Sequence, residues 1–222
     1  MYNEAIEILN KIGNKYEAYI IGGYPRDLYI GNINKDIDIT TNATKEQLKE
    51  IFKEYEIIER GFGSVILNYN NYQFEITTYR KEIGYTKNRF PKKIEYVNTL
   101  EEDIKRRDFV INTLCIDKNG EYIDLLDARK DIDNKIIRCV SNSDIKIEED
   151  ILRSLRAIRF ATILNFKLDD ELKQSIKKYS YLLDNLSSKR KEEELNKILS
   201  NKNKEYGISL LKELGIDKYI HF

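Results

Sequence analysis

The stretch Asp36-Ile37-Asp38 holds two carboxylates at a spacing that can do chemistry. Residues two apart on a β-strand point to the same side, so on a strand both carboxylates project together while Ile37 faces the packed side. Two like charges side by side are costly unless a cation lies between them. The pair therefore predicts a metal site, with room for two Mg²⁺ ions about 3.5–4 Å apart.

A glycine-rich turn comes shortly before this pair, in the run Gly22-Gly23-Tyr24-Pro25-Arg26-Asp27. Glycines let a backbone approach a phosphate closely, and a helix starting near Pro25 would aim N–H groups at it. Taken alone, a double glycine serves as often as a plain strand-to-helix turn. Together with Arg26 and the acidic pair, it indicates metal-dependent phosphoryl or nucleotidyl transfer.

A second charged cluster runs from Arg106 to Leu114. Taken alone, it is best interpreted as an exposed charge run beside a buried segment. Beside a metal site, Arg107 is a candidate for the triphosphate, because its guanidinium fork matches phosphate oxygens. Asp108 and Asn112 would be close if the segment begins a helix, and could order the sugar or the metal site.

A third cluster, residues 149–161, holds Asp150 and Arg153, which are neighbours if they share a helix. An ordinary surface ion pair is the plain interpretation. Alternatively, the carboxylate accepts from an amino group while the guanidinium donates to a ring nitrogen, which admits cytosine and adenine and rejects uracil and guanine. Arg156 and Arg159 lie progressively further round such a helix, where phosphate or RNA backbone is the better ligand.

The elements that position these residues can be expected from periodicity and turn residues. Residues 81–98 are polar and basic, contain Pro91, and predict a long flexible loop. The remaining pattern predicts helices over residues 4–13, 26–29 and 44–52, strands over 18–21, 36–40, 65–67 and 72–79, and a hairpin turn over 68–71. Thr44 and Gln47 have the spacing of a capping box at the start of the third helix.

From about Glu148 onward the pattern predicts no strand. Helical spacing is carried by four groups of apolar residues: Ile151, Leu155 and Ile158; Leu172, Ile176 and Leu183; Leu195, Ile198 and Leu199; Ile208 to Leu214. An α+β half is thus followed by an all-helical half, with a boundary near residues 140–148.

Composition restricts the classes of protein that remain. The 222 residues carry 38 basic and 38 acidic side chains, so a surface for polyanions must be local. Apolar runs are too short for a transmembrane helix, and the first residues lack a secretory layout, which predicts the cytoplasm. Cys115 and Cys139 are expected to be reduced core residues, and the position of the single histidine, His221, at the chain end argues against histidine acid-base chemistry.

In this order the clusters resemble the bacterial-type (class II) tRNA nucleotidyltransferase and poly(A) polymerase family. The matching stretches are 22–27, 36–38, 74–80, 106–114, 124–140 and 149–161, and residues 186–199 resemble the family's neck helix. The resemblance implies a polymerase-beta-like head with a mixed or antiparallel sheet over residues 1–145. An all-helical neck for nucleotide and RNA binding would follow over 146–222, without the body and tail of longer members.

The resemblance also implies roles for individual residues. Asp36 and Asp38 would be Mg²⁺ ligands and catalytic, and Glu75 is either a third catalytic carboxylate or a strand residue that pairs with Arg80. The nucleotide would be bound by Gly22, Gly23, Arg26, Arg107, Asp150, Arg153, Arg156 and Arg159.

Within the family we expect CCA addition to tRNA 3′ ends from CTP and ATP, with release of pyrophosphate, and neither DNA nor a membrane as partner. Residues 80–98 resemble a head loop that CC-only enzymes lack, and Arg60–Val65 does not clearly supply the poly(A) polymerase signature. A poly(A) polymerase or a partial (CC- or A-) adding enzyme is the alternative. Rivals of other kinds are a catalytically silent RNA-binding module and an enzyme that nucleotidylates a protein or small molecule.

Overall fold

The computed structural model describes residues 1–32, 36–86 and 90–220, so His221 lies outside the described residues. The chain divides into two compact units. Unit 1 comprises Met1–Glu82, Ile94–Arg107 and Ile111–Arg129, and unit 2 comprises Ile83–Lys93, Asp108–Val110 and Lys130–Phe222. Within the described ranges, no helix is long and apolar enough to cross a membrane.

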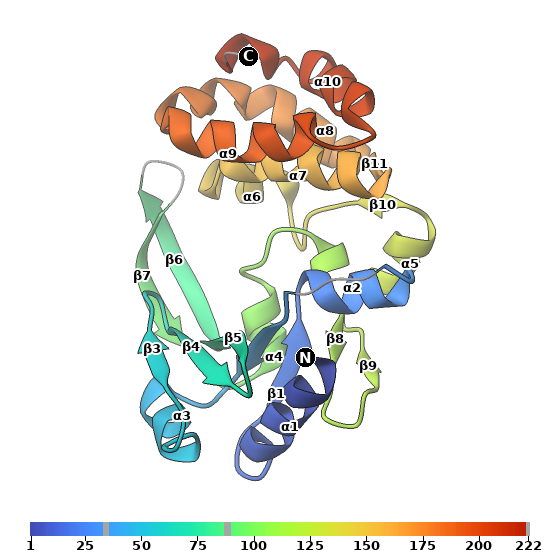
Figure 1. Cartoon of the computed structure of the whole chain (residues 1–222). Helices are drawn as coiled ribbons and strands as arrows, with labels where there is room; N and C mark the ends of the chain where they lie inside the picture. Colours follow the sequence, from blue (N-terminus) through green and yellow to red (C-terminus); the bar gives the residue numbers. More distant parts are fainter. Residues whose placement is uncertain (33–35, 87–89, 221–222) are drawn as a thin grey trace. The chain divides into compact units, whose positions relative to one another are not determined.

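Unit 1 is built on a seven-stranded sheet with the strand order β3-β4-β5-β2-β1-β8-β9 (Figure 1). Its strands are β1 (Ala18–Ile21), β2 (Asp38–Thr41), β3 (Ile57–Glu59), β4 (Ser64–Tyr69), β5 (Tyr72–Thr78), β8 (Cys115–Ile116) and β9 (Tyr122–Ile123). Strands β2 and β5 pair parallel, and the other neighbouring strands pair antiparallel. The predicted mixed sheet is thus confirmed.

Helices cover both faces of this sheet. They are α1 (Tyr2–Ile12), α2 (Gly23–Tyr29), α3 (Lys45–Ile51) and α4 (Leu100–Ile104), with a 3₁₀ turn η1 (Val110–Asn112) at the boundary of unit 1. Ile20 and Ile39 pack in a core with the buried side of α1, whereas Ile21 packs in a second cluster with Leu100 and Ile104 of α4. Asp38 and Thr40, which alternate with Ile39, therefore project toward the α4 side.

Local sequence signals specify several joints of unit 1. Thr44 and Gln47 form the predicted capping box at the start of α3. Asn70 and Asn71 both have positive φ and connect β4 to β5, as in a two-residue hairpin turn of type I′. The predicted hairpin is confirmed, with strands that extend two residues further into the expected turn on one side. Cys115 and Cys139 are buried with free thiols, as expected for core residues.

The prediction of a long loop over residues 81–98 is wrong. Most of this stretch forms a two-stranded sheet from β6 (Arg80–Thr86) and β7 (Phe90–Tyr96), although Arg89 lies outside the described residues. Strand β6 alternates between exposed and partly buried positions without one fully buried residue. Because neither face is covered by a core, the apolar/polar alternation that reveals a strand in sequence is missing.

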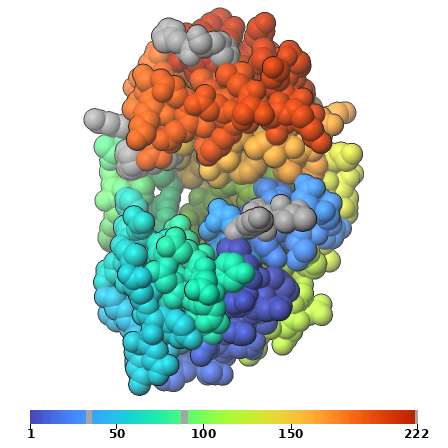
Figure 2. Space-filling model, viewed as in Figure 1, coloured from blue at the N-terminus to red at the C-terminus, as the bar shows by residue number. Residues whose placement is uncertain are grey.

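Unit 2 is mainly helical. Its elements are α5 (Ala128–Asp133, which begins in unit 1), β10 (Ile136–Ile137), α6 (Ser143–Glu149), α7 (Leu152–Leu164), β11 (Lys167–Leu168), α8 (Asp170–Tyr179), η2 (Ser180–Asn185), α9 (Ser188–Leu199), α10 (Lys204–Glu213) and η3 (Asp217–Tyr219). Helix α7 packs against α9 and α10, and α6 packs against α8. The space-filling view shows α9 and α10 as a closed orange-to-red layer (Figure 2).

Two expectations for this part are corrected. Strand β11 pairs parallel with β10, although no strand was predicted beyond Glu148; two residues are too few to show a period. Leu183 lies in η2 and not in α8, because the α-helix ends at Tyr179 and continues as a 3₁₀ helix. The other predicted helices are confirmed as α7, α8, α9 and α10.

Candidate active site

The glycine turn brings the backbone against an acidic side chain. Gly22 follows the last residue of β1, has φ 91°, and is the N-cap of α2, which begins at Gly23. A Cβ placed on Gly22 would lie 3.3 Å from Oδ2 of Asp38. Both the positive φ and this close approach require glycine here.

Arg26 is buried and its guanidinium connects two segments of unit 1. Its Nε donates to Oδ1 of Asp27 at 2.9 Å, and its Nη1 donates to Oδ1 of Asn112 in η1 at 2.5 Å. Only 5% of Arg26 is exposed. Arg26 thus joins α2 to the predicted second cluster.

The acidic pair does not lie on one strand as predicted. Asp38 is the first residue of β2, whereas Asp36 precedes the strand and is exposed. The alternation of burial nevertheless extends through the segment, because Ile37 and Ile39 are each 1% exposed. Only one carboxylate of the pair is therefore fixed by the sheet ladder.

Glu75 supplies a third carboxylate beside Asp38. The parallel pairing of β2 with β5 sets Glu75 directly opposite Asp38. In the described part of the chain, no hydrogen bond or ion pair joins Glu75 to Arg80, which was the alternative. The Arg80 guanidinium instead binds Glu82, with Nη2 2.9 Å from Oε1, and the backbone oxygen of Phe62.

The electrostatics of Asp38 reflect this crowding. Burial raises the pKa of Asp38 to about 6, the charges of Asp36 and Glu75 raise it as well, and Arg107 acts in the opposite direction. A carboxylate that resists ionisation is stabilised in its charged form when a cation is added.

The carboxylates present fit a Mg²⁺ site in which the protein supplies only a few of the ligands. Among the described residues, no group of three or more acidic, histidine or cysteine side chains is arranged to surround a metal ion. Mg²⁺ is usually held by one or two carboxylates, and substrate phosphates and water complete its coordination. Asp36 and Asp38 can supply those two carboxylates.

A cavity of about 180 Å³ opens beside Asp38 within unit 1. It is lined by Ile21, Asp38, Ile39, Ser64, Glu75, Thr77, Arg80, Arg106 and Arg107. Three guanidinium groups thus lie around a space that two carboxylates also face. Such a cavity can hold a polyphosphate together with a cation.

Asp150 does not share a helix with Arg153, contrary to the prediction. It is the C-cap of α6 with φ −142° and ψ 99°, and α7 begins only at Leu152. The Oδ1 of Asp150 accepts a hydrogen bond from the Leu152 backbone N–H at 3.1 Å. This side-chain bond to the backbone offers an alternative to continuing the helix.

Arg153 lies on α7 and is 5% exposed. Its Nη1 donates to the backbone oxygen of Lys146 at 2.8 Å and to Oε2 of Glu149 at 2.9 Å. The guanidinium carbon lies 5.9 Å from the centre of the Tyr85 ring. A carboxylate that binds Arg153 directly is thus Glu149, four residues earlier.

The next two arginines of α7 each bind a carboxylate from another segment of unit 2. Arg156 donates from Nε and Nη2 to Oδ2 of Asp108 at 2.8 and 2.6 Å. Arg159 forms an ion pair with Glu194 of α9, with 2.8 Å between Nε and Oε2. Both guanidinium carbons also lie over the Phe160 ring, 5.5 and 4.3 Å from its centre.

The predicted site residues therefore fall into two groups. Unit 1 brings together Gly22, Asp36, Asp38, Glu75 and Arg107, with Gly23 and Arg26 on the adjoining α2. Unit 2 holds Asp150, Arg153, Arg156 and Arg159 at the start of and along α7.

Sequence reasoning missed two carboxylates that bind these arginines. Asp103 binds Arg106 and Arg107, and Glu149 binds Arg153. The signal was present, since an acidic residue three or four positions before an arginine is the spacing of helical ion pairs.

Two protein-family models match the chain. Residues 18–138 match the family described as Poly A polymerase head domain. Residues 165–221 match the family described as Probable RNA and SrmB-binding site of polymerase A.

Similar proteins include two CCA-adding enzymes. The enzyme of Ligilactobacillus salivarius is 39% identical over 219 residues, which are 98% of this chain and 54% of the relative. The enzyme of Enterococcus faecalis is 37% identical over the same shares. The chain thus spans about half the length of these curated relatives.

Solved structures of similar fold include a Bacillus stearothermophilus CCA-adding enzyme in complex with CTP. It has a TM-score of 0.90 and 33% identity, with 99% of this chain and 53% of that chain covered. A Thermotoga maritima CCA-adding enzyme complexed with tRNA has a TM-score of 0.79 and 25% identity, with 97% and 51% covered. The chain belongs to the tRNA nucleotidyltransferase and poly(A) polymerase family that its motifs resemble.

Proposed function

We propose that the protein adds C, C and A to the 3′ end of tRNA from CTP and ATP and releases pyrophosphate. The observation that carries this proposal is the group of carboxylates around Asp38, set beside a cavity lined by three arginines. The family match and the names of the relatives support the same reaction.

The reaction assigns roles to unit 1. Asp36 and Asp38 would hold Mg²⁺, as the family generally uses a divalent metal. Bound as a pair of ions, Mg²⁺ would lower the pKa of the attacking hydroxyl and neutralise the triphosphate. The Gly22-Gly23 turn would let the phosphates approach the backbone, Arg107 would bind them, and Glu75 would be the third carboxylate. The primer 3′ oxygen then attacks the α-phosphate, and pyrophosphate leaves on the opposite side.

Base choice would come from unit 2. Asp150 accepts from the exocyclic amino group of cytosine or adenine, and Arg153 donates to the adjacent ring nitrogen. Arg153 is held by Glu149 and Lys146, so its donor geometry is fixed before a base binds. Preorganised donors discriminate well because a wrong base leaves buried polar groups unpaired.

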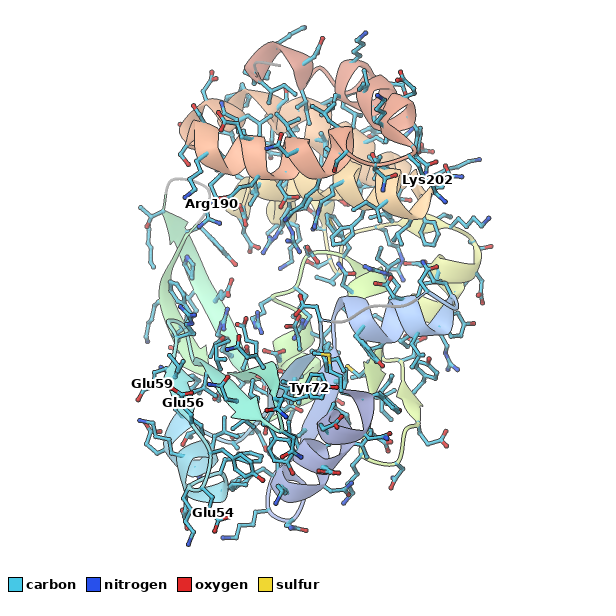
Figure 3. The ribbon with its side chains drawn as sticks, viewed as in Figure 1. Glu54, Glu56, Glu59, Tyr72, Arg190 and Lys202 are labelled. Atoms are coloured by element: carbon cyan, nitrogen blue, oxygen red, sulfur yellow. The ribbon has the colours of Figure 1, made fainter. Side chains whose placement is uncertain are left out.

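Residues 1–145 would form the catalytic head, and residues 146–222 would recognise the nucleotide and bind RNA. The match of residues 165–221 to an RNA-binding family supports the second assignment. Arg190 and Lys202, labelled in Figure 3, are exposed near the two ends of α9 and are candidates for phosphate contacts.

An incorporation assay tests the proposal. Purified protein receives Mg²⁺, labelled nucleotides singly and in mixture, and tRNA that ends at the discriminator base. We expect two additions from CTP and a third from ATP, with little use of UTP or GTP. Long tracts of A would instead favour a poly(A) polymerase, and two additions without a third would favour a partial enzyme. No incorporation would favour a silent RNA-binding module.

A further inference from the structure

Asp103 on α4 is an acidic residue with 0% exposure. Its carboxylate accepts four hydrogen bonds from four different residues of unit 1. The donors are Arg106 Nε at 2.8 Å and the Arg80 backbone N–H at 3.2 Å on Oδ1, and Thr40 Oγ1 at 3.2 Å and Arg107 Nη2 at 3.3 Å on Oδ2. A carboxylate offers about four lone-pair positions, so Asp103 is saturated.

These four hydrogen bonds connect β2 to the arginines that line the cavity. Thr40 lies two residues after Asp38 on β2, so both side chains are on the same face of the sheet. Arg106 and Arg107 line the cavity beside Asp38. The buried Asp103 carboxylate thus connects β2, the strand that carries Asp38, to Arg106 and Arg107, two of the arginines that line the cavity.

Arg107 depends on this contact more than its neighbours do. Among the described residues, Asp103 is its single hydrogen-bond acceptor, and its buried Nε has none. The Arg80 guanidinium, by contrast, is fixed by Glu82 and by the backbone oxygen of Phe62. The orientation of the Arg107 fork is therefore set mainly by Asp103.

Asp103 remains ionised in this environment. Burial acts to raise its pKa, but the charges of Arg106 and Arg107 outweigh burial, and the pKa is lowered from its ordinary value. The contact is thus a charged one, and charge-assisted hydrogen bonds hold geometry more strongly than neutral ones.

We propose that Asp103 is a positioning residue that holds Arg107 and Arg106 at a fixed distance from Asp38, so that their guanidinium groups meet the phosphates of a nucleoside triphosphate. This inference rests on the proposed function. It assigns Asp103 a role in phosphate binding through the arginines and not through contact with the nucleotide.

A simpler role for Asp103 would be to neutralise the arginines, and the two roles predict opposite signs. If Asp103 only offsets charge, its removal makes the cavity more positive and phosphate binds more tightly. If Asp103 positions the arginines, its removal lets them leave their places and phosphate binds more weakly.

The test is Asp103→Asn, with Glu102→Gln on the same helix as the matched control. Glu102 also loses one negative charge, but its partners are Lys81 and Thr99, outside the cavity. Affinity for inorganic triphosphate and for CTP is measured by calorimetry, and folding by thermal denaturation. We expect about tenfold or greater weakening of both ligands for Asp103→Asn and no change for Glu102→Gln. Unchanged or tighter binding would overturn the inference.

A second pair of variants keeps the test valid if Asp103→Asn does not fold. Thr40→Val removes one hydroxyl donor to Asp103 at nearly constant volume, and Thr40→Ser keeps that donor. We expect a loss of about threefold or more in triphosphate affinity for the first and recovery for the second. Equal affinity of both variants and the parent protein would refute the positioning role.

Triphosphate binding also separates this inference from the proposed function. If the parent protein binds triphosphate in an Asp103-dependent way but adds no nucleotide to RNA, the proposed function fails and the positioning role stands. If nucleotides are added and Asp103→Asn does not change the affinity for triphosphate, the positioning role is refuted and the proposed function stands. A parent protein that binds no triphosphate overturns both.

Discussion

Asp38 in unit 1 has neighbours of its own charge, whereas the arginines of α7 in unit 2 have neighbours of opposite charge. In unit 1, Asp38 lies beside Asp36 and Glu75, and the pKa of its carboxyl is raised to about 6 by burial and by these neighbours. In unit 2, each arginine of α7 already binds a carboxylate: Arg153 binds Glu149, Arg156 binds Asp108, and Arg159 binds Glu194. The carboxylates around Asp38 therefore repel one another, which a bound cation can relieve, whereas the guanidinium groups of α7 are held in place before any ligand binds.

Of the variants considered, Asp38→Ala should reduce catalysis most strongly. Nucleotide addition is expected to fall by about 10³-fold or more, because metal-assisted charge stabilisation is worth several kcal/mol. Glu59→Ala is the matched control, since Glu59 is an exposed carboxylate on β3 that binds Lys45 and Lys49 (Figure 3). If Asp38→Ala incorporates nucleotides as well as the parent protein, Asp38 is not a ligand of the metal site.

Glu194→Gln tests the compensated charges of unit 2. The side chains of Arg159 and Glu194 are 13% and 8% exposed, so the variant loses a nearly buried negative charge that lies 2.8 Å from the Arg159 guanidinium. The free energy of unfolding should fall by about 3 kcal/mol in urea titrations. Glu213→Gln, which breaks the exposed pair with Lys173, should cost less than about 1 kcal/mol. Equal losses in the two variants would contradict the distinction.

Asp38→Asn should raise the free energy of unfolding, whereas Glu194→Gln should lower it. A folded pKa of about 6 lies above the ordinary value of 3.8, so the folded chain binds this proton more tightly than the unfolded chain. The contribution of Asp38 to stability is present below about pH 4 and is lost as the pH rises to about 6. Without divalent metal, the variant should gain on the order of 2 kcal/mol over the parent protein between pH 4 and pH 7. A gain that does not depend on pH would rule out this explanation.

Gly22→Ala and Gly31→Ala test whether the close approach of Gly22 to Asp38 matters for nucleotide addition. Both glycines have positive φ, but only Gly22 would bring a Cβ within 4 Å of another residue, the Asp38 carboxylate. Each change should cost about 1 kcal/mol in unfolding free energy from backbone strain. Nucleotide addition should fall only for Gly22→Ala, and a comparable loss for Gly31→Ala would show that strain alone is responsible.

The sequence predicts the parts of unit 1 that local signals specify. The glycine turn, the capping box of Thr44 and the β4–β5 hairpin each depend on a few neighbouring residues, and the structure has all three. The position of Glu75 beside Asp38 follows from parallel pairing between strands that are distant in sequence, which no local pattern encodes. The sequence could therefore nominate Glu75 but could not place it.

The helical site shows a different limit. Helical spacing alone suggested that Asp150 and Arg153 are neighbours on one helix, but Asp150 has extended backbone and its side chain bonds to the Leu152 N–H. Asp is a residue that competes with the helix in this way, so the break has a recognisable cause once it is seen. The sheet of β6 and β7 is not predicted for the complementary reason, since strands without a buried face lack a period-two pattern.

The central place of β2 in its sheet has a consequence for motion. This strand is hydrogen-bonded on one side to β1 and on the other to β5, so its amides belong to the part of unit 1 that opens least often. We expect the amide hydrogens of Ile39 and Thr40 to exchange with solvent only when unit 1 unfolds as a whole. Ligands can then enter and leave while the backbone that carries Asp38 stays fixed.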